Sequence, residues 1–328
     1  SNWSVGDGTA VCRQRPGLTG FTHRRPPCGI GAHHRQMDRR GCFGAGCGRP
    51  VAGVCPGDNR LIISTDQEGG WVQHLTGPGF DRMPTAVDQG TMSTDQLRQS
   101  ASVWGSQLAA AGINVDLAPV LGTVVANRAA NAPIGALYRD FGLDAAGNAA
   151  QGTAFVQGMA DAGVQSAIKH YPGLGAVTGN TDFTADGILD TTTTLDGTEI
   201  KAFDTTIDQA DPAMVMMALA TYQAIDPNDP AVFSSIIIDG HLRGDLGYDG
   251  VVISDSMSAA AVSAYDTTQL GVKLVEAGGD LACIGYTNYV APILDGLSTR
   301  AASDPAFANE VTQSAIRVMT LKIKMGLA

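Results

Sequence analysis

From residue 60 to the C-terminus, short apolar runs alternate with segments of helical period, and this alternation limits the fold more than any other feature. The apolar runs that we expect to form strands are 61–66, 113–120, 164–169, 213–219, 251–255 and 281–285. The expected helices are 93–111, 144–162, 197–209, 234–246, 267–277 and 306–327. Continuous apolar strands that alternate with helices predict a parallel sheet covered on both faces.

The positions of the polar residues distinguish between two folds that have a parallel sheet, the doubly wound sheet and the barrel. Six strands would suit a doubly wound sheet, but no Gly-x-Gly-x-x-Gly turn follows the first strand. Asp66, Lys169-His170 and Asp255 each stand at the C-terminal end of a predicted strand, where a barrel of this class builds its active site. The sequence therefore predicts an α/β fold, a TIM-type (β/α)8 barrel that is incomplete or irregular at its N-terminus. Its two missing strands can come only from the first 58 residues.

Residues 1–58 differ in composition from the rest of the chain. They contain five of the six cysteines and eight arginines, with three aspartates and neither Lys nor Glu, so the remainder carries a net charge of about −16. A Cys/His metal module around Cys42 and Cys47 would need a second pair at a zinc-type spacing, which is absent. A disulfide-stapled extension is a second interpretation. We prefer a third, in which 1–58 is a poorly structured or frame-shifted part of the barrel and 59–328 is the catalytic barrel.

Charge and motifs exclude several classes of function. A net charge of −11 argues against nucleic acid as a partner, because phosphate binding needs clustered Lys and Arg. No apolar stretch reaches the roughly 18–20 residues that span a bilayer, so we expect no integral membrane segment. There is no Gly-x-Ser-x-Gly, no His-Glu-x-x-His and no phosphate-binding loop. We expect neither a metal nor an organic cofactor.

Asp255 is the first candidate for catalysis. It closes the apolar run 251–255 and is followed by the small residues Ser256 and Ser258, so its carboxylate is expected at the barrel mouth. A glycosidase needs two groups that flank the scissile bond, one to protonate the leaving oxygen and one to attack the anomeric carbon. The alternative for Asp255 is an N-cap of the segment that begins near Ser258.

Three further polar groups follow predicted strands. Lys169 and His170 open the segment KHYPGLG, and residues of these types grip sugar hydroxyls, although a core His and a surface Lys are the alternative. Asp182 lies on the loop that follows, where it is either a catalytic carboxylate or a turn residue. Asp66 begins the cluster DQEGG, whose glycines permit close approach of a ligand.

Taken in order, these segments resemble glycoside hydrolase family 3. The similar segments are DQEGG at 66–70, INVDLAPV at 113–120, NAPIGALYRDFG at 131–142, KHYPGLG at 169–175 and LRGDLGYDGVVISDSM at 242–257. The resemblance covers the chain from about residue 60 and implies Asp255 as the nucleophile. It also implies that Arg139 grips the sugar, together with Asp66, Lys169 and His170. The single-barrel length is similar to the bacterial β-N-acetylhexosaminidase branch, and the loop 169–182 resembles the actinobacterial members of that branch.

The chain departs from the family pattern at several positions. The hexosaminidase branch usually carries Asp-Ser-His after the Lys-His motif, with the His as acid/base, whereas this chain has Asn180-Thr181-Asp182. Asp182 is therefore the expected acid/base, with a pKa raised by burial or by a neighbour. Trp71 replaces the usual arginine after Glu-Gly-Gly, Gly122 an aspartate, and Ser256 the second acid of Ser-Asp-Asp.

The resemblance implies a retaining exo-glycosidase that removes terminal β-linked N-acetylglucosamine from cell-wall fragments through a covalent glycosyl-Asp255 intermediate. The alternatives are another family 3 exo-glycosidase, such as a β-glucosidase, and an impaired barrel that binds glycans weakly. The expected partner is a carbohydrate, and the expected state is a monomer. A secreted form or an envelope lipoprotein fits this role better than a cytoplasmic one.

Overall fold

The computed structural model describes residues 2–6, 9–13, 59–125 and 127–328, with side chains from residue 59 onward. The interpretations of residues 1–58 as a metal module, a disulfide extension or a frame-shifted segment depend on side chains outside the described residues. The division of the chain at 58/59 therefore stays a prediction.

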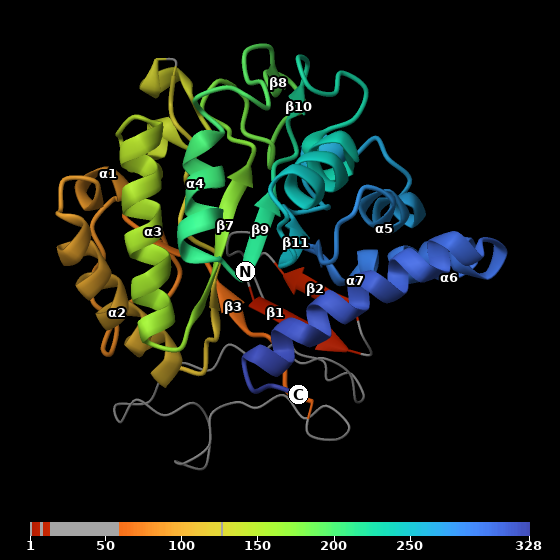
Figure 1. The fold of residues 1–328 in the computed structure, drawn as a ribbon, viewed down its shortest axis with the longest axis horizontal. Helices are drawn as coiled ribbons and strands as arrows, with labels where there is room; N and C mark the ends of the chain where they lie inside the picture. Colours follow the sequence, from red (N-terminus) through yellow and green to blue (C-terminus); the bar gives the residue numbers. More distant parts are fainter. Residues whose placement is uncertain (1, 7–8, 14–58, 126) are drawn as a thin grey trace, which may run out of the picture.

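A five-stranded parallel sheet forms the centre of the molecule, and its strands follow one another around it in chain order (Figure 1). In order they are β3 (Ser64–Thr65), β6 (Val115–Asp116), β7 (Gln165–Tyr171), β9 (Met214–Met217) and β11 (Val251–Ser254). A parallel bridge between Ile253 and Leu281 continues the series toward β12 (Ala282–Cys283). All six predicted strands are confirmed, and their sequential pairing is the winding of an α/β barrel.

An N-terminal hairpin occupies the place of the two missing strands. β1 (Asn2–Gly6) and β2 (Thr9–Arg13) pair antiparallel, β2 pairs parallel with β12, and β1 lies against β3 (red in Figure 1). The gap between the last and the first parallel strand is therefore spanned by a hairpin instead of two strand–helix units. The predicted barrel, irregular at its N-terminus, is confirmed.

The helices pack outside the sheet, and their bounds agree closely with the helical periods. They are α1 (Ala86–Gln89), α2 (Thr94–Ala110), α3 (Ala145–Asp161), α4 (Lys201–Ala210), α5 (Thr267–Glu276), α6 (Val290–Ser303) and α7 (Pro305–Lys324). Ser93 caps α2 by accepting from Gln96 N, and the Gln96 side chain bonds the Ser93 N–H in return, as the capping-box sequence predicts. Only α1 and α6 lie outside the predicted helices.

Residues 234–246 differ from the prediction in the type of helix. The segment Ile236–Asp245 forms a π-helix, η4, in which Gly240 N bonds Ser235 O and Leu246 N bonds His241 O, each five residues back. Gly240 and Gly244 lower the preference for a regular α-helix, and the wider turn satisfies the backbone at both ends. Periodicity alone does not separate the two helix types over so short a segment.

The shorter elements lie at the strand ends and in the loops. They are the strands β4 (Gln67–Gly69), β5 (Val72–Gln73), β8 (Leu189–Asp190) and β10 (Thr221–Tyr222), and the 3-10 turns η1 (Arg128–Ala130), η2 (Gly135–Leu137), η3 (Ala231–Phe233), η5 (Ala260–Val262) and η6 (Thr287–Tyr289). β4 and β5 form a hairpin directly after β3. β8 pairs with β10 above the ends of β7 and β9 (Figure 1), which fixes the far end of the loop after β7.

Two sets of buried apolar residues support the site. The larger set fills the space between the sheet and helices such as α2, α3 and α5. The smaller set holds Leu117, Ala167, Met216 and Cys283, with Val318 and Leu321 of α7 packed against it. Side chains on a strand point alternately to its two faces, so Lys169 falls on the same face of β7 as Ala167. A charged residue thus stands directly above an apolar floor.

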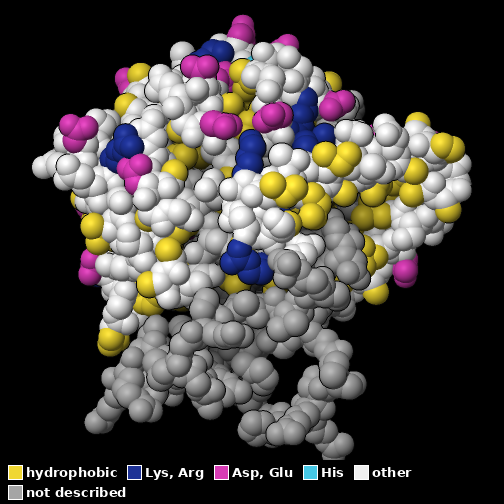
Figure 2. Space-filling view, turned by 60° about the horizontal axis from the view of Figure 1, so that its bottom comes forward, with side chains coloured by type: hydrophobic (Ala, Val, Ile, Leu, Met, Phe, Trp, Pro, Cys, Tyr) yellow, Lys and Arg dark blue, Asp and Glu magenta, His cyan; other side chains and the backbone are white. Residues whose placement is uncertain are grey.

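The surface agrees with the acidic composition. Figure 2 shows carboxylates spread singly over the face in view, and hydrophobic side chains gathered along the arm formed by α6 and α7. That arm carries the exposed residues Leu294, Ile316 and Ile323. Within the described part of the chain, no helix combines the length and the apolar character needed to cross a bilayer.

Candidate active site

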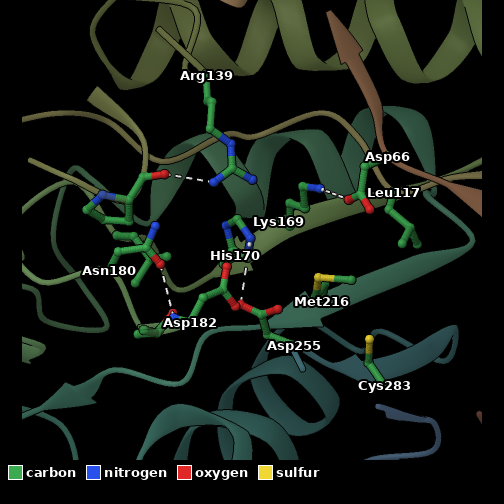
Figure 3. Close-up of a pocket in the computed structure, with 13 residues that line it drawn as sticks. Asp66, Leu117, Arg139, Lys169, His170, Asn180, Asp182, Met216, Asp255 and Cys283 are labelled. Carbon is green, nitrogen blue, oxygen red and sulfur yellow. Dashed lines mark hydrogen bonds and ion pairs between the residues drawn. The ribbon is translucent and has the colours of Figure 1, made fainter. Parts of the chain in front are cut away.

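The predicted site residues meet in one pocket at the C-terminal ends of the strands. Asp66, Arg139, Lys169, His170, Asp182 and Asp255 all line it, together with Pro133, Leu174, Asn180 and Thr181. Leu117, Met216 and Cys283 form its apolar floor (Figure 3). All six predicted residues are therefore brought together by five different segments, although they are spread over 190 positions of the chain.

Lys169 is the centre of a charged network on one wall of the pocket. Its Nζ lies 2.6 Å from Asp66 Oδ1 and 2.7 Å from Glu68 Oε1. Arg139 donates to both oxygens of Glu68, from Nε and from Nη2, at 2.8 Å each. It also donates to Pro133 O at 2.7 Å. This bidentate pair fixes the plane of the guanidinium group beside the pocket.

Burial and charge act in opposite directions on this wall. Burial by itself raises the pKa of Asp66 and of Glu68, but Lys169 beside Asp66, and Arg139 with Lys169 beside Glu68, lower both pKa values below their usual range. Burial lowers the pKa of Lys169, and the two carboxylates more than reverse that effect. The four groups are therefore charged at neutral pH, and together they carry no net charge.

Asp255 lies at the end of β11, as its position in the sequence predicts. Its backbone N–H donates to Met217 O of β9 at 3.0 Å, which continues the strand pairing up to the site. Its Oδ1 accepts the N–H of Ser256 at 2.7 Å. The other oxygen, Oδ2, lies 3.8 Å from His170 Nε2. One oxygen is thus held by the backbone while the other is directed into the pocket.

Asp182 reaches the pocket on the loop after β7. Its backbone N–H donates to Asn180 Oδ1 at 3.0 Å, and the loop is tied to η5 by bonds from Ala260 N to Asp182 O and from Ala261 N to Thr181 O. Asp182 Oδ1 is buried and has no hydrogen-bond partner among the described residues. In Figure 3 the carboxyl groups of Asp182 and Asp255 point toward one another below His170.

The two facing carboxyl groups have raised pKa values. Burial raises the pKa of Asp182. Burial, and next the negative charge of Asp182, raise the pKa of Asp255 to about 7. Two like charges so close in a buried site are not ionised together until the pH is high, so the pair holds one proton near neutral pH. The Ser256 N–H favours the charged form of Asp255, whereas the unpartnered Oδ1 of Asp182 favours a proton on Asp182.

His170 is neutral in this pocket. Burial, and then the positive charges of Arg139 and Lys169, lower the pKa of His170 well below its ordinary value. Its Nδ1 is buried without a hydrogen-bond partner in the part of the chain that the structure describes. A neutral imidazole between the cationic wall and Asp255 can donate or accept a hydrogen bond without adding a charge.

Glu68 and Asp116 belong to the site but were not predicted as site residues. Glu68 stands inside the DQEGG segment, so its motif indicated it, but its contacts with Lys169 and Arg139 required the folded barrel. Asp116 ends β6, and its Oδ1 accepts the N–H of Gln67 at 2.9 Å. Burial raises the pKa of Asp116 to about 8, so it is an uncharged acid behind the charged wall. In the sequence, the feature that could have identified Asp116 as a site residue is its position at the end of a predicted strand.

Two of the positions that depart from the family pattern lie beside the site. A Cβ at Gly122 would lie 3.0 Å from Ile134 Cδ1 and 3.3 Å from Leu174 N, so a larger side chain there would press on the loop after β7. Ser256 gives its N–H to Asp255, and its hydroxyl lies 3.0 Å from that of Ser258. Among the described residues there is no group of three or more His, Cys, Asp and Glu side chains that would hold a metal ion.

A barrel whose mouth holds two facing carboxyl groups, beside charged side chains able to bind sugar hydroxyls, defines the class of glycoside hydrolases. The model of the family described as “Glycosyl hydrolase family 3 N terminal domain” matches residues 54–321 of the chain. The chain belongs to glycoside hydrolase family 3, and the predicted family is confirmed. Its partner is accordingly a carbohydrate.

Relatives and solved structures of the same family resemble the chain over most of its length. β-Hexosaminidase LpqI of Mycobacterium tuberculosis is 32% identical over 278 residues, which are 80% of this chain and 68% of that protein. A β-hexosaminidase of Stenotrophomonas maltophilia is 32% identical over 267 residues, 78% of this chain and 76% of that one. The crystal structure of the β-N-acetylhexosaminidase of Beutenbergia cavernae is 44% identical in sequence, with a TM-score of 0.77. The match covers 80% of this chain and 78% of that chain.

Proposed function

We propose that this chain is a retaining β-N-acetylhexosaminidase that removes terminal β-linked N-acetylglucosamine. The observation that carries the proposal is the pair of facing carboxyl groups of Asp255 and Asp182 in a pocket walled by Lys169 and Arg139. The β-hexosaminidase and β-N-acetylhexosaminidase names of the similar proteins support the choice of sugar. The roles below are parts of the same proposal.

In the first step Asp255 attacks and Asp182 protonates. The free oxygen of Asp255 forms a bond to the anomeric carbon while the bond from that carbon to the glycosidic oxygen breaks. The proton of Asp182 passes to the departing oxygen, so the leaving group departs as a neutral alcohol. The products are a glycosyl ester on Asp255 and an ionised Asp182.

In the second step the same two groups exchange tasks. Asp182 takes a proton from a water molecule, whose oxygen attacks the anomeric carbon as the ester bond to Asp255 breaks. Asp255 is released as a carboxylate and Asp182 carries its proton again. Two displacements at one carbon return the configuration of the substrate, so the product is the β-anomer.

The charged wall holds the sugar in place. The carboxylate of Asp66 accepts from sugar hydroxyls, and Lys169 and Arg139 donate to them. Because Glu68 anchors both cations from behind, they keep their geometry before the substrate arrives. A preformed site of this kind loses little free energy to ordering when the substrate binds.

The natural substrate, the oligomeric state and the location are also proposed from the sequence. Cell-wall fragments that end in N-acetylglucosamine are the proposed substrate, the proposed state is a monomer, and the proposed location is the envelope or the exterior of the cell. Fractionation of the source cells with an antibody, and size-exclusion chromatography with light scattering, test the last two directly.

Hydrolysis of paired aryl glycosides tests the proposed activity. The native chain is expected to release nitrophenol from the aryl β-N-acetylglucosaminide at least about 100-fold faster than from the aryl β-glucoside, a difference of about 2.7 kcal/mol in the barrier. The reverse preference would identify a β-glucosidase. Release from neither, by a chain that melts cooperatively, would identify an impaired barrel.

A further inference from the structure

The side chain of Asn131 joins the two loops that carry Arg139 and Asp182, although Asn131 does not line the pocket itself. Arg139 belongs to the loop after β6 and Asp182 to the loop after β7, and both side chains reach the same pocket (Figure 3). The position of one loop relative to the other therefore decides how a sugar held by Arg139 presents its glycosidic oxygen to the proposed acid.

The amide group of Asn131 makes three short hydrogen bonds. Its Nδ2 donates to Leu174 O and to Val177 O, at 2.7 Å each. Its Oδ1 accepts the N–H of Gly135 at 2.6 Å. Because carbonyl oxygens face one end of the amide and an N–H faces the other, the surroundings determine which end is nitrogen. The residue is only 1% exposed, so water does not compete for these bonds.

On one side, the amide holds the base of the loop after β7. Leu174 and Val177 are almost fully buried, so their carbonyl groups need donors from within the protein. Two positions beyond Val177, the N–H of Gly179 donates to Gly187 O at 2.8 Å. This bond closes the segment that carries Asp182. The two bonds from the amide therefore fix the point from which that segment extends.

On the other side, the same residue holds the turn that supports Arg139. The N–H of Gly135 is bound by the Asn131 side chain, and the N–H of Ala136 donates to the Asn131 backbone carbonyl at 2.9 Å. Pro133 lies within this turn and lines the pocket. Its carbonyl accepts from Arg139 Nη1 at 2.7 Å. The guanidinium group is thus bound to the turn that Asn131 closes.

We infer that Asn131 is a positioning residue of the proposed reaction, which keeps the guanidinium group of Arg139 and the carboxyl group of Asp182 at a fixed separation. The inference rests on the proposed function, in which Arg139 binds the sugar and Asp182 protonates the leaving oxygen. A misplacement of about 1 Å between such groups can lower the rate about 100-fold. A residue that only stabilised the fold would affect all substrates of the enzyme alike.

The test compares two substrates that differ in their need for a proton. The methyl β-N-acetylglucosaminide needs one to release its alcohol, whereas the dinitrophenyl glycoside does not. Asn131→Ala is expected to lower kcat/KM about 100-fold on the methyl glycoside. On the dinitrophenyl glycoside we expect a loss of about tenfold, through weaker binding at Arg139. The ratio of the two kcat/KM values should therefore fall about tenfold.

Asn131→Asp provides a second, isosteric variant. It keeps the acceptor for the Gly135 N–H but has no N–H groups for Leu174 O and Val177 O, so the loop after β7 is released while the turn is kept. The ratio of the two kcat/KM values is again expected to fall about tenfold. This variant also tests the inference if Asn131→Ala does not fold.

Asn114→Ala is the matched control. The Asn114 amide also bridges backbone groups, accepting from Ile63 N at 2.8 Å and donating to Leu61 O at 3.1 Å. These bonds lie just before β3 and β6, at the end of the strands opposite to the pocket. The control is expected to lower the melting temperature and to leave the ratio of the two kcat/KM values within twofold of the native ratio.

The outcomes separate the inference from the proposed function. If the native chain cleaves both substrates and the folded variants of Asn131 keep the native ratio, Asn131 has no positioning role and the proposed function stands. An equal loss on both substrates would likewise overturn the positioning role. If the native chain cleaves neither substrate, the proposed function fails, and the positioning role fails with it.

Discussion

The ammonium group of Lys169 lies 2.7 Å from Glu68 Oε1, and both side chains are almost fully buried. Glu68 also binds Arg139 through both of its oxygens. One carboxylate behind the pocket therefore anchors the two cations that face the proposed substrate. Removing one partner of a buried ion pair costs more than the pair contributes, because the remaining charge stays buried.

Glu68→Gln is expected to lower the free energy of unfolding by about 2–4 kcal/mol. It should also lower kcat/KM about 10–100-fold, mainly through KM, because Lys169 and Arg139 lose their fixed geometry. Urea denaturation and steady-state kinetics on the aryl N-acetylglucosaminide measure the two effects. Glu310→Gln, at an exposed position of α7, is the matched control and should change neither. A Glu68→Gln chain with native kinetics would refute the anchoring role.

Asp182→Ala tests the acid/base role through the leaving group. A neutral alcohol needs a proton to depart, whereas dinitrophenolate departs without one. The variant should therefore lose about 100–10,000-fold in kcat/KM on the methyl glycoside and far less on the dinitrophenyl glycoside. Asp186→Ala, an exposed carboxylate of the same loop, is the control. Equal losses on both substrates would show that Asp182 does not supply the proton.

The facing carboxyl groups predict a pH dependence of stability. The pKa of Asp255 is raised to about 7 in the folded chain, against about 3.9 for a free aspartate. The folded pair of Asp255 and Asp182 therefore holds its shared proton more tightly than the unfolded chain does. Below about pH 4 the group is protonated in both the folded and the unfolded chain, so it costs no stability. The loss in the free energy of unfolding grows as the pH rises and is complete above about pH 7.

Asp255→Asn removes one of the two repelling carboxylates. It should raise the free energy of unfolding at pH 8 by about 1–4 kcal/mol relative to the native chain, with a much smaller difference at pH 4. Urea denaturation at the two pH values measures the change. Asp295→Asn, at an exposed position of α6, is the control. If Asp255→Asn is less stable than the native chain at pH 8, the buried carboxylates of Asp255 and Asp182 do not destabilise the fold by repulsion.

Gly175 is predicted to be required where the loop after β7 packs on the loop after β6. A Cβ at this position would lie 1.7 Å from Thr123 O, a backbone atom, so one of the two loops must move. Gly175→Ala should lower the free energy of unfolding by about 1–3 kcal/mol, and it should slow hydrolysis, because the displaced loop carries Asp182. Gly240→Ala, whose Cβ would find its nearest neighbour at 3.6 Å, is the control. Native stability of Gly175→Ala would show that the loops adjust freely.

Local patterns predicted most of the fold. The six strands and the bounds of α2 and α3 follow from hydrophobic runs and from residues with strong local preferences, such as the Ser93 that caps α2. The segment of α6 shows a weak helical signal, because it contains Pro292 and Gly296. The hairpin of β1 and β2 depends on long-range pairing with β12, which no local period indicates.

The members of the site were predictable, but their contacts were not. Strand ends marked Asp66, Lys169 and Asp255, since a barrel gathers its strand ends at one face. The bonds of Glu68 join segments about 70 to 100 positions apart, so they exist only after the barrel has formed. The roles of Asp255 and Asp182 stay predictions until they are tested by chemistry.

The central claim is that Asp255 is the nucleophile, and rescue by azide tests it most directly. Asp255→Ala should lose at least about 1,000-fold in hydrolysis of the dinitrophenyl β-N-acetylglucosaminide, because no group remains to form the glycosyl ester. Azide can then enter from the side that Asp255 occupied, so added azide should restore turnover and give the α-glycosyl azide, identified by NMR. Hydrolysis by Asp255→Ala near the native rate, or a β-glycosyl azide product, would contradict the account.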